Sequence, residues 1–176
     1  MGFLTPKLTD ATIRRAVKDY LGDGARKKLV VVKYGDISHW DVSSVTNMFR
    51  MFQEASSFNQ PLNNWNVSNV TDMGEMFYNA SSFNQPLDNW NVSNVTDMFL
   101  MFRDANSFNQ PLNNWNVSNV TNMWYMFDGA SSFNQPLNKW NVSNDVTYMR
   151  RMFDGADSFN QPLHAPWYHD EESDSE

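Results

Sequence analysis

Residues 65–89 read WNVSNVTDMGEMFYNASSFNQPLDN, and nearly the same phrase occurs five times between Trp40 and Ala165. The five copies begin at Trp40, Trp65, Trp90, Trp115 and Trp140, so they follow one another at intervals of 25 residues. Only the fifth copy carries an insertion, Asp145. A period of 20–50 residues is typical of solenoids and other repeat arrays. The sequence therefore predicts a stack of similar coils.

Each repeat, numbered from its tryptophan, divides into three parts. Trp at position 1 and Val at position 3 alternate with polar residues, which is typical of a short half-buried strand. Thr at position 7 is a suitable helix N-cap, and the apolar residues at positions 9, 12, 13 and 16 then share one face of a short helix. The closing Ser-Phe-Asn-Gln-Pro-Leu predicts a return loop, in which we expect the asparagine to bond backbone groups. We predict an α/β repeat solenoid, leucine-rich-repeat-like, with a short parallel β-sheet on one side and short helices on the other.

The chain divides into three regions on this basis. Residues 1–39 are predicted to form an N-terminal helical cap, with a helix over residues 9–21 and either a strand or a second helical turn over residues 29–34. Residues 40–165 hold the repeats, and residues 166–176 are predicted to form a short cover followed by a disordered acidic tail. The repeats span 40–64, 65–89, 90–114, 115–139 and 140–165.

Charge is unevenly distributed between the cap and the repeats. Eight basic and four acidic residues give residues 1–39 a net charge of +4, whereas five basic and sixteen acidic residues give the remainder −11. The basic region is either a cap with solvated lysines or a contact surface. The acidic array argues against nucleic acid as a partner. No signal peptide or membrane-spanning stretch is recognisable, which favours a cytoplasmic or virion-associated protein over a secreted one and predicts no membrane partner.

The sequence offers no motif for catalysis. Cysteine is absent, which excludes disulfides and thiolate chemistry, and the three histidines share no spacing typical of a metal site. No glycine-rich phosphate loop, serine nucleophile elbow or paired-acid motif occurs. We therefore expect a non-enzymatic protein with no catalytic, metal-binding or cofactor-binding residues.

The repeat resembles that of BspA-type leucine-rich-repeat surface proteins, whose units run W-x-V-S-x-V-T-x-M-x-x-M-F-x-x-A-x-x-F-N-Q-x-L. All five copies match this pattern nearly throughout residues 40–165. The resemblance implies a leucine-rich-repeat-like solenoid and a role in adhesion or protein binding at microbial surfaces. The chain departs from the surface members in having no recognisable leader, lipid-attachment cysteine or cell-wall anchor.

Positions that differ between the copies are the first candidates for a binding function. Positions 10, 11, 14 and 15 would lie on the outer face of the predicted helix. Aromatic residues and arginine are enriched at binding hot spots, so these side chains either cover the helix layer or bind a protein partner. The candidate residues are Phe49, Phe99, Leu100, Trp124, Tyr125, Arg150 and Arg151.

The outward face of the predicted strand is the alternative site. Its position-2 side chains would either bond to one another along the stack or form a polar lattice for a repeating ligand such as a glycan. These residues are Asp41, Asn66, Asn91, Asn116 and Asn141. The leading hypothesis is a protein–protein interaction scaffold. The alternatives are a carbohydrate- or surface-binding adhesion module, or a structural component of a larger assembly such as a virion, with the chain a monomer or part of that assembly.

Overall fold

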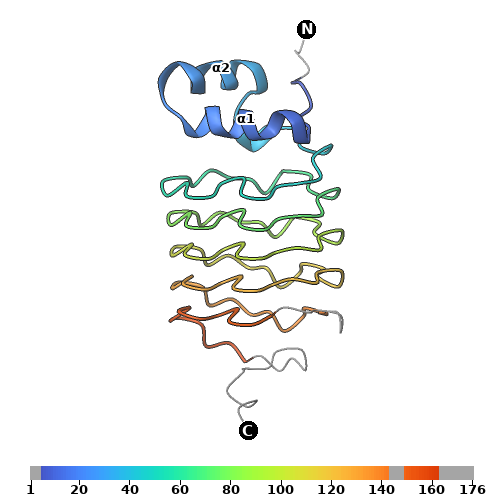
Figure 1. Cartoon of the computed structure of the whole chain (residues 1–176), viewed down its shortest axis with the longest axis vertical. Helices are drawn as coiled ribbons and strands as arrows, with labels where there is room; N and C mark the ends of the chain where they lie inside the picture. The colour runs from blue at the N-terminus through green and yellow to red at the C-terminus, as the bar shows by residue number, and fades with distance from the viewer. Residues whose placement is uncertain (1–4, 143–148, 163–176) are drawn as a thin grey trace.

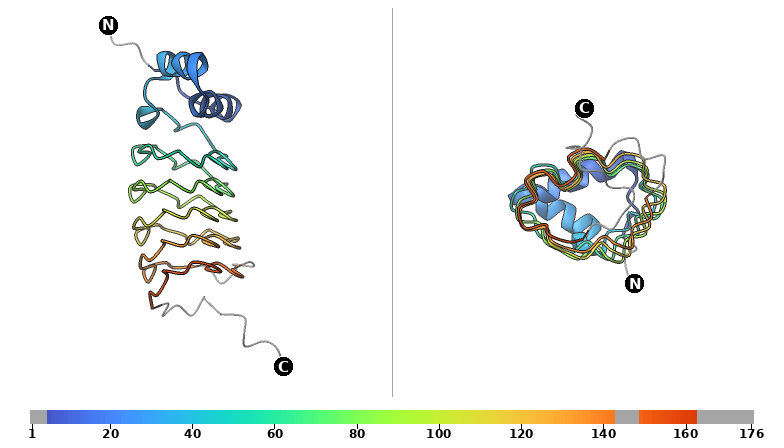
Figure 2. Two further views of the ribbon diagram at one scale, coloured as in Figure 1. Left: turned by 90° about the vertical axis from the view of Figure 1, so that its left-hand side faces the viewer. Right: turned by 90° about the horizontal axis from the view of Figure 1, so that it is seen from below.

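A computed structural model describes residues 5–142 and 149–162 of the chain. Two helices, α1 (Asp10–Leu21) and α2 (Gly24–Tyr34), and the short 3-10 helix η1 (Ile37–His39) precede a stack of similar coils (Figure 1). Seen along the stack, the coils superpose on one closed outline, with the helices across one end (Figure 2). The predicted solenoid of 25-residue repeats with N-terminal helices is therefore confirmed.

The secondary structure predicted inside the repeats is wrong. In the described part of the repeats, the backbone forms turns and contains neither an α-helix nor an extended strand. The parallel β-sheet is reduced to isolated bridges at position 8, which join Asn47 to Asp72, Asp72 to Asp97 and Asp97 to Asn122. Each coil is thus a chain of turns rather than a strand followed by a helix.

Hydrogen bonds between coils take the place of the predicted helix. The N–H of Met48 donates to the carbonyl of Asp72 at 2.8 Å, and that of Arg50 donates to the carbonyl of Gly74 at 2.9 Å. Positions 11 and 15 have positive φ in every coil, which a right-handed helix does not accommodate. They are Arg50, Glu54, Glu75, Asn79, Leu100, Asp104, Tyr125, Gly129, Arg151 and Gly155. The backbone therefore alternates between turn bonds within a coil and bonds to the next coil.

The helical pattern was nevertheless informative about which side chains point inward. Met98, Met101, Phe102 and Ala105 occupy positions 9, 12, 13 and 16 of the third coil, and all four are fully buried. The turns bring these positions to the interior just as one face of a helix would. Hydrophobic spacing therefore identified the core, although it did not distinguish a helix from consecutive turns.

Aromatic ladders run through the interior because each ring occupies the same position in successive coils. The Phe102 ring centroid lies 5.5 Å from that of Phe77 and 5.5 Å from that of Phe127, with nearly parallel planes. A second ladder, which includes Phe108, packs against the first with a centroid separation of 4.1 Å. No coil encloses this core alone, so adjacent coils stabilise one another.

Hydrogen-bond ladders also join successive coils, both within the core and in the return loops. The indole N–H of Trp90 donates to the carbonyl of Leu62 at 2.9 Å, and the same bond recurs in neighbouring coils. In the return loop, the side-chain oxygen of Asn84 accepts from the backbone N–H of Asn109 at 2.9 Å and from the Gln110 amide at 3.0 Å. This confirms the predicted bonding of the repeated asparagine to the backbone.

The N-terminal helices cover the first coil. Thr9 is the N-cap of α1, which lies within the predicted helix, and residues 29–34 belong to α2, so the strand alternative for them is wrong. Side chains of α1 make hydrogen bonds to the first coil in place of the backbone groups of a preceding coil. The Asp10 carboxylate accepts from the Thr46 N–H at 2.9 Å, whereas in the next coil the Thr46 carbonyl accepts from the Thr71 N–H at 2.8 Å. Likewise, Arg14 donates to the Phe49 carbonyl at 2.6 Å.

The Asp10 contacts predict a pH-dependent contribution to stability. Burial opposes ionisation of Asp10, but hydrogen bonds from Thr46 and Asn47 and the charge of Arg14 outweigh it and lower the pKa of this carboxyl. We expect Asp10→Ala to lower the free energy of unfolding by about 1 kcal/mol at pH 7. Because the folded-state pKa lies below the unfolded value of about 4, this contribution is complete above that value and is lost as the pH falls through the folded-state pKa.

Urea unfolding of the wild type and the Asp10→Ala variant at pH 7 and pH 2.5 measures this contribution. The difference between the two proteins is expected to shrink at the lower pH. An equal difference at both pH values would show that ionisation of Asp10 does not stabilise the cap.

Candidate binding surface

The variable positions 10, 11, 14 and 15 lie along one side of the stack, and we refer to them as the variable face. The chain turns there, and the neighbouring positions 9, 12 and 13 are directed into the core. The structure exposes Trp124 by 37 % but buries Leu100, which is only 9 % exposed. Phe49, Phe99 and Tyr125 are half-buried, and Arg150 and Arg151 are exposed. The prediction that Leu100 is an exposed contact residue is therefore wrong.

Three of the predicted residues form an aromatic cluster, which we define as Phe99, Trp124 and Tyr125. The Trp124 ring lies 6.1 Å from Phe99 and 5.1 Å from Tyr125, measured between centroids. Arg151 approaches the Tyr125 hydroxyl at 3.4 Å. Phe49 lies apart from the cluster, because it leans over Gly74 in the second coil: a Cβ on Gly74 would lie 3.1 Å from the Phe49 ring.

Arg103 and Tyr78 adjoin the cluster, although the sequence interpretation did not single them out. The Arg103 guanidinium lies 5.6 Å from the Tyr125 ring and 5.9 Å from the Tyr78 ring. Both residues occupy position 14, so the signal in the sequence was the variation of that position between copies. Cation–π contacts of this kind hold a guanidinium against an aromatic surface.

Acidic residues border the cluster on its position-14 and position-15 side. Arg103 Nε lies 3.0 Å from an Asp128 carboxylate oxygen and 3.4 Å from one of Asp104. Burial raises the pKa of the Asp128 carboxyl, with Asp104 and Asp154 acting in the same direction, against the opposing charge of Arg103. The aromatic cluster thus lies between carboxylates on one side and the exposed arginines of the fifth coil on the other.

The position-2 row also reaches the surface, but its bonding differs from the prediction. Asp41, Asn66, Asn91, Asn116 and Asn141 are all exposed. The Asn66 side-chain oxygen accepts from the backbone N–H of Ser68 at 3.2 Å and from its hydroxyl at 2.7 Å, so the amide bonds within its own coil. The predicted amide-to-amide stack along this row is therefore wrong, because a local Asx turn satisfies the side chain first.

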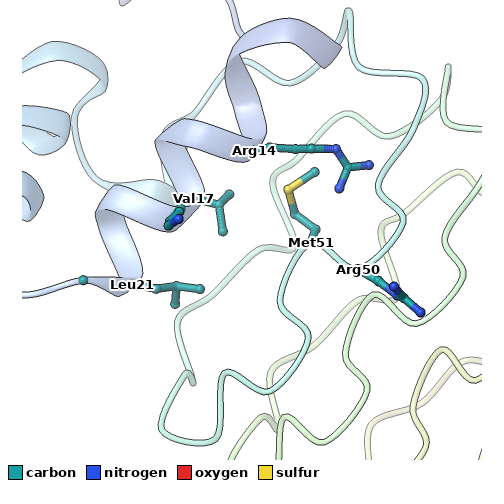
Figure 3. A pocket seen from close by; sticks show the side chains of 7 residues that line it. Arg14, Val17, Leu21, Arg50 and Met51 are labelled. Carbon is teal, nitrogen blue, oxygen red and sulfur yellow. The ribbon is translucent and has the colours of Figure 1, made fainter.

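A hollow of about 360 Å³ at the junction of α1 and the first coil was not predicted, and we call it the cap groove. Figure 3 shows the lining side chains of Arg14, Val17 and Leu21 on α1 and of Arg50 and Met51 on the first coil, with the Arg50 guanidinium directed away from α1. Lys18 and Gly22 complete its lining. Its residues come from segments about thirty positions apart, so no sequence spacing joins them.

The described part of the chain holds neither a cluster of potential metal ligands nor a membrane-spanning helix. No group of three or more histidine or acidic side chains within residues 5–142 and 149–162 is arranged to hold a metal ion. No helix in that part of the chain is both long and apolar enough to cross a membrane. His164, His169 and the predicted C-terminal cover and acidic tail lie outside the described residues.

Comparison with known proteins gave one family. A family model described as "Mycoplasma protein of unknown function, DUF285" matches the chain twice, over residues 32–110 and 87–175. The two matches overlap and together span every repeat. No curated protein and no solved structure matches the chain.

Proposed function

The chain belongs to the family described as Mycoplasma protein of unknown function, DUF285, and we propose that this member is a non-enzymatic scaffold that binds a protein through its aromatic cluster. The family description assigns no role, so the proposal depends on the surface of this chain. The observation that carries it is the 37 % exposure of Trp124 beside the half-buried rings of Phe99 and Tyr125.

The chemistry of the cluster suits protein recognition. Trp, Tyr and Arg are the residues most enriched at interface hot spots, where a few side chains supply most of the binding energy. Here Trp124 and Tyr125 are flanked by Arg103 and Arg151, and ring stacking orders the aromatic side chains before a partner arrives. Preordered side chains lose less conformational entropy on binding. The net charge of −7 disfavours nucleic acid as the partner.

The exposed position-2 row supports a second candidate function. Repeated Asn and Ser side chains at one coil spacing offer a regular set of donors and acceptors to a repeating ligand such as a glycan. The resemblance of the repeat to BspA-type surface proteins favours this adhesion function. The same resemblance implies that the repeats are related to leucine-rich repeats. A structural part in a larger assembly is the third alternative, and a strictly monomeric chain with no tendency to assemble would count against it.

Site-specific photo-crosslinking tests the leading proposal. A benzoylphenylalanine placed at position 124 in the full chain is expected to capture a partner protein in extracts of cells that produce the chain, and the same group at position 91 is the control on the rival row. With the captured partner purified, Phe99→Ala and Trp124→Ala together should weaken its binding at least tenfold, while Asn91→Ala should not. Equal affinities for all variants, with unchanged melting temperatures, would refute the proposal.

A further inference from the structure

We propose that the cap groove binds an acidic peptide segment that carries a large apolar side chain. The groove is lined by α1 and the first coil, whereas the aromatic cluster belongs to the third and fourth coils. Figure 1 shows that α1 lies at one end of the stack. This inference goes beyond the proposed scaffold function, and its test does not depend on that function. Of the two interpretations of the basic N-terminal region, a cap with solvated lysines or a contact surface, the proposal adopts the contact surface.

Three cations line the groove, and contacts with the first and second coils fix two of them. Arg14 donates to the Phe49 carbonyl and to the Asn47 side chain at 2.7 Å, which uses two of its five N–H groups. Arg50 is bound by Glu75 and still has a half-exposed side chain. Lys18 makes no side-chain hydrogen bond or ion pair within the described part of the chain. The groove therefore presents two positioned guanidinium groups and one freely available ammonium group.

Apolar side chains form the rest of the lining. Val17 and Met51 are almost fully buried, at 2 % and 5 % exposure, whereas Leu21 is 40 % exposed at the rim. A volume of about 360 Å³ is at the lower end of ligand pockets, and it suits a single large side chain. Covering Leu21 with an apolar side chain would remove hydrophobic surface from water.

Charge complementarity selects an acidic partner. Of the four acidic residues in the described cap, Asp10 bonds to Thr46, Asp19 pairs with Arg15 at 2.7 Å, and Asp36 bonds to Ser38. The fourth, Asp23, follows the lining residue Gly22 but does not itself line the groove. Among the described residues no carboxylate lines the groove, and the one bound to a lining cation is Glu75, on Arg50. The lining thus keeps an excess of positive charge that an acidic peptide would neutralise.

The apolar lining and the acidic repeats distinguish this occupant from other anions. Inorganic phosphate would gain nothing from Val17, Leu21 and Met51. A nucleic acid that entered the groove would extend over repeats with a net charge of −6, counted over residues 40–165. A short acidic segment with one apolar side chain satisfies both the cations and the apolar lining.

Fluorescence anisotropy with a labelled peptide, GEEELEEEG, tests the proposal on the full chain at low salt. We expect saturable binding that weakens steeply with salt. Two control peptides separate the contributions, since GQQQLQQQG lacks the charge and GEEEGEEEG lacks the apolar side chain. Each control peptide is expected to bind at least fivefold more weakly than GEEELEEEG.

Matched charge reversals locate the site. Lys18→Glu, in the groove, is expected to weaken binding at least tenfold, while Lys28→Glu, an exposed change of equal charge on α2 outside the groove, should weaken it less than twofold. Lys18→Gln and Lys28→Gln repeat the comparison without adding a negative charge near the end of α1, and circular dichroism checks that all variants fold. Equal losses at positions 18 and 28, equal binding of GEEEGEEEG, or no binding at millimolar peptide would each overturn the proposal.

Discussion

Replacing Phe102 with alanine is expected to lower the free energy of unfolding by about 3–5 kcal/mol. Phe102 is fully buried, and its ring contacts Phe77 and Phe127 in the coils on either side. Within its own coil it stacks on Phe108 at 4.1 Å. A cavity here would remove contacts from three successive coils, and the turns around it have no regular helix or sheet with which to compensate.

Phe153→Ala is the matched control, because the same residue occupies the same repeat position in the fifth coil. Phe153 is half-buried, whereas Phe102 is fully buried, and the Phe153 ring stacks on Phe127 at 5.6 Å and on Phe159 at 4.1 Å. Because less of its surface is removed from water, its replacement is expected to cost less than half as much as that of Phe102. Urea unfolding followed by circular dichroism measures both values, and equal losses would contradict the dependence of the cost on burial within the stack.

Replacing Arg50 with alanine is expected to lower the urea midpoint of unfolding, but by less than removal of one partner from a fully buried pair would. Glu75 is only 5 % exposed and accepts from Arg50 Nε at 2.8 Å and Nη2 at 2.9 Å. Without Arg50 the carboxylate would keep only the Gln53 amide at 3.3 Å. Water can reach the carboxylate from the half-exposed Arg50 side. We therefore expect a smaller loss of stability than in a fully buried ion pair.

Glu75→Leu provides the comparison that separates charge burial from packing. The third coil carries Leu100 at the equivalent position, where it is 9 % exposed and shares the positive φ. We therefore expect Glu75→Leu alone to change stability by less than about 1 kcal/mol. The double variant Arg50→Ala and Glu75→Leu should recover most of the stability lost in the single Arg50 variant, and a double variant as unstable as that single one would refute this explanation.

The sequence by itself determined the repeat architecture, the first helix and the identity of the core. A 25-residue period places equivalent residues above one another, so the burial of Phe102 and its ladder neighbours follows from the repetition alone. The helix predicted over residues 9–21 likewise corresponds to α1. These features depend on residues close together in the chain or on exact repetition, and a sequence records both.

The candidate surface was only partly predictable. Variation between copies correctly identified Phe99, Trp124 and Tyr125 as neighbours on one face. It did not reveal that Leu100 is buried or that Arg103 packs between two tyrosine rings. Those outcomes depend on the positive φ at position 11 and on side chains in adjacent coils, which together set how far each side chain reaches from the surface.

Only the tertiary structure decided what the backbone does within a coil and how the cap meets the stack. Turns and a short helix bring the same positions inward, so the apolar pattern does not distinguish them. The choice depends on where the backbone N–H groups find acceptors, and the acceptor of Met48 is Asp72, in the next coil. Asp10 and Arg14 meet the first coil, and the cap groove forms beside them, for the same reason: these contacts join residues far apart in the chain, and no local pattern in the sequence specifies them.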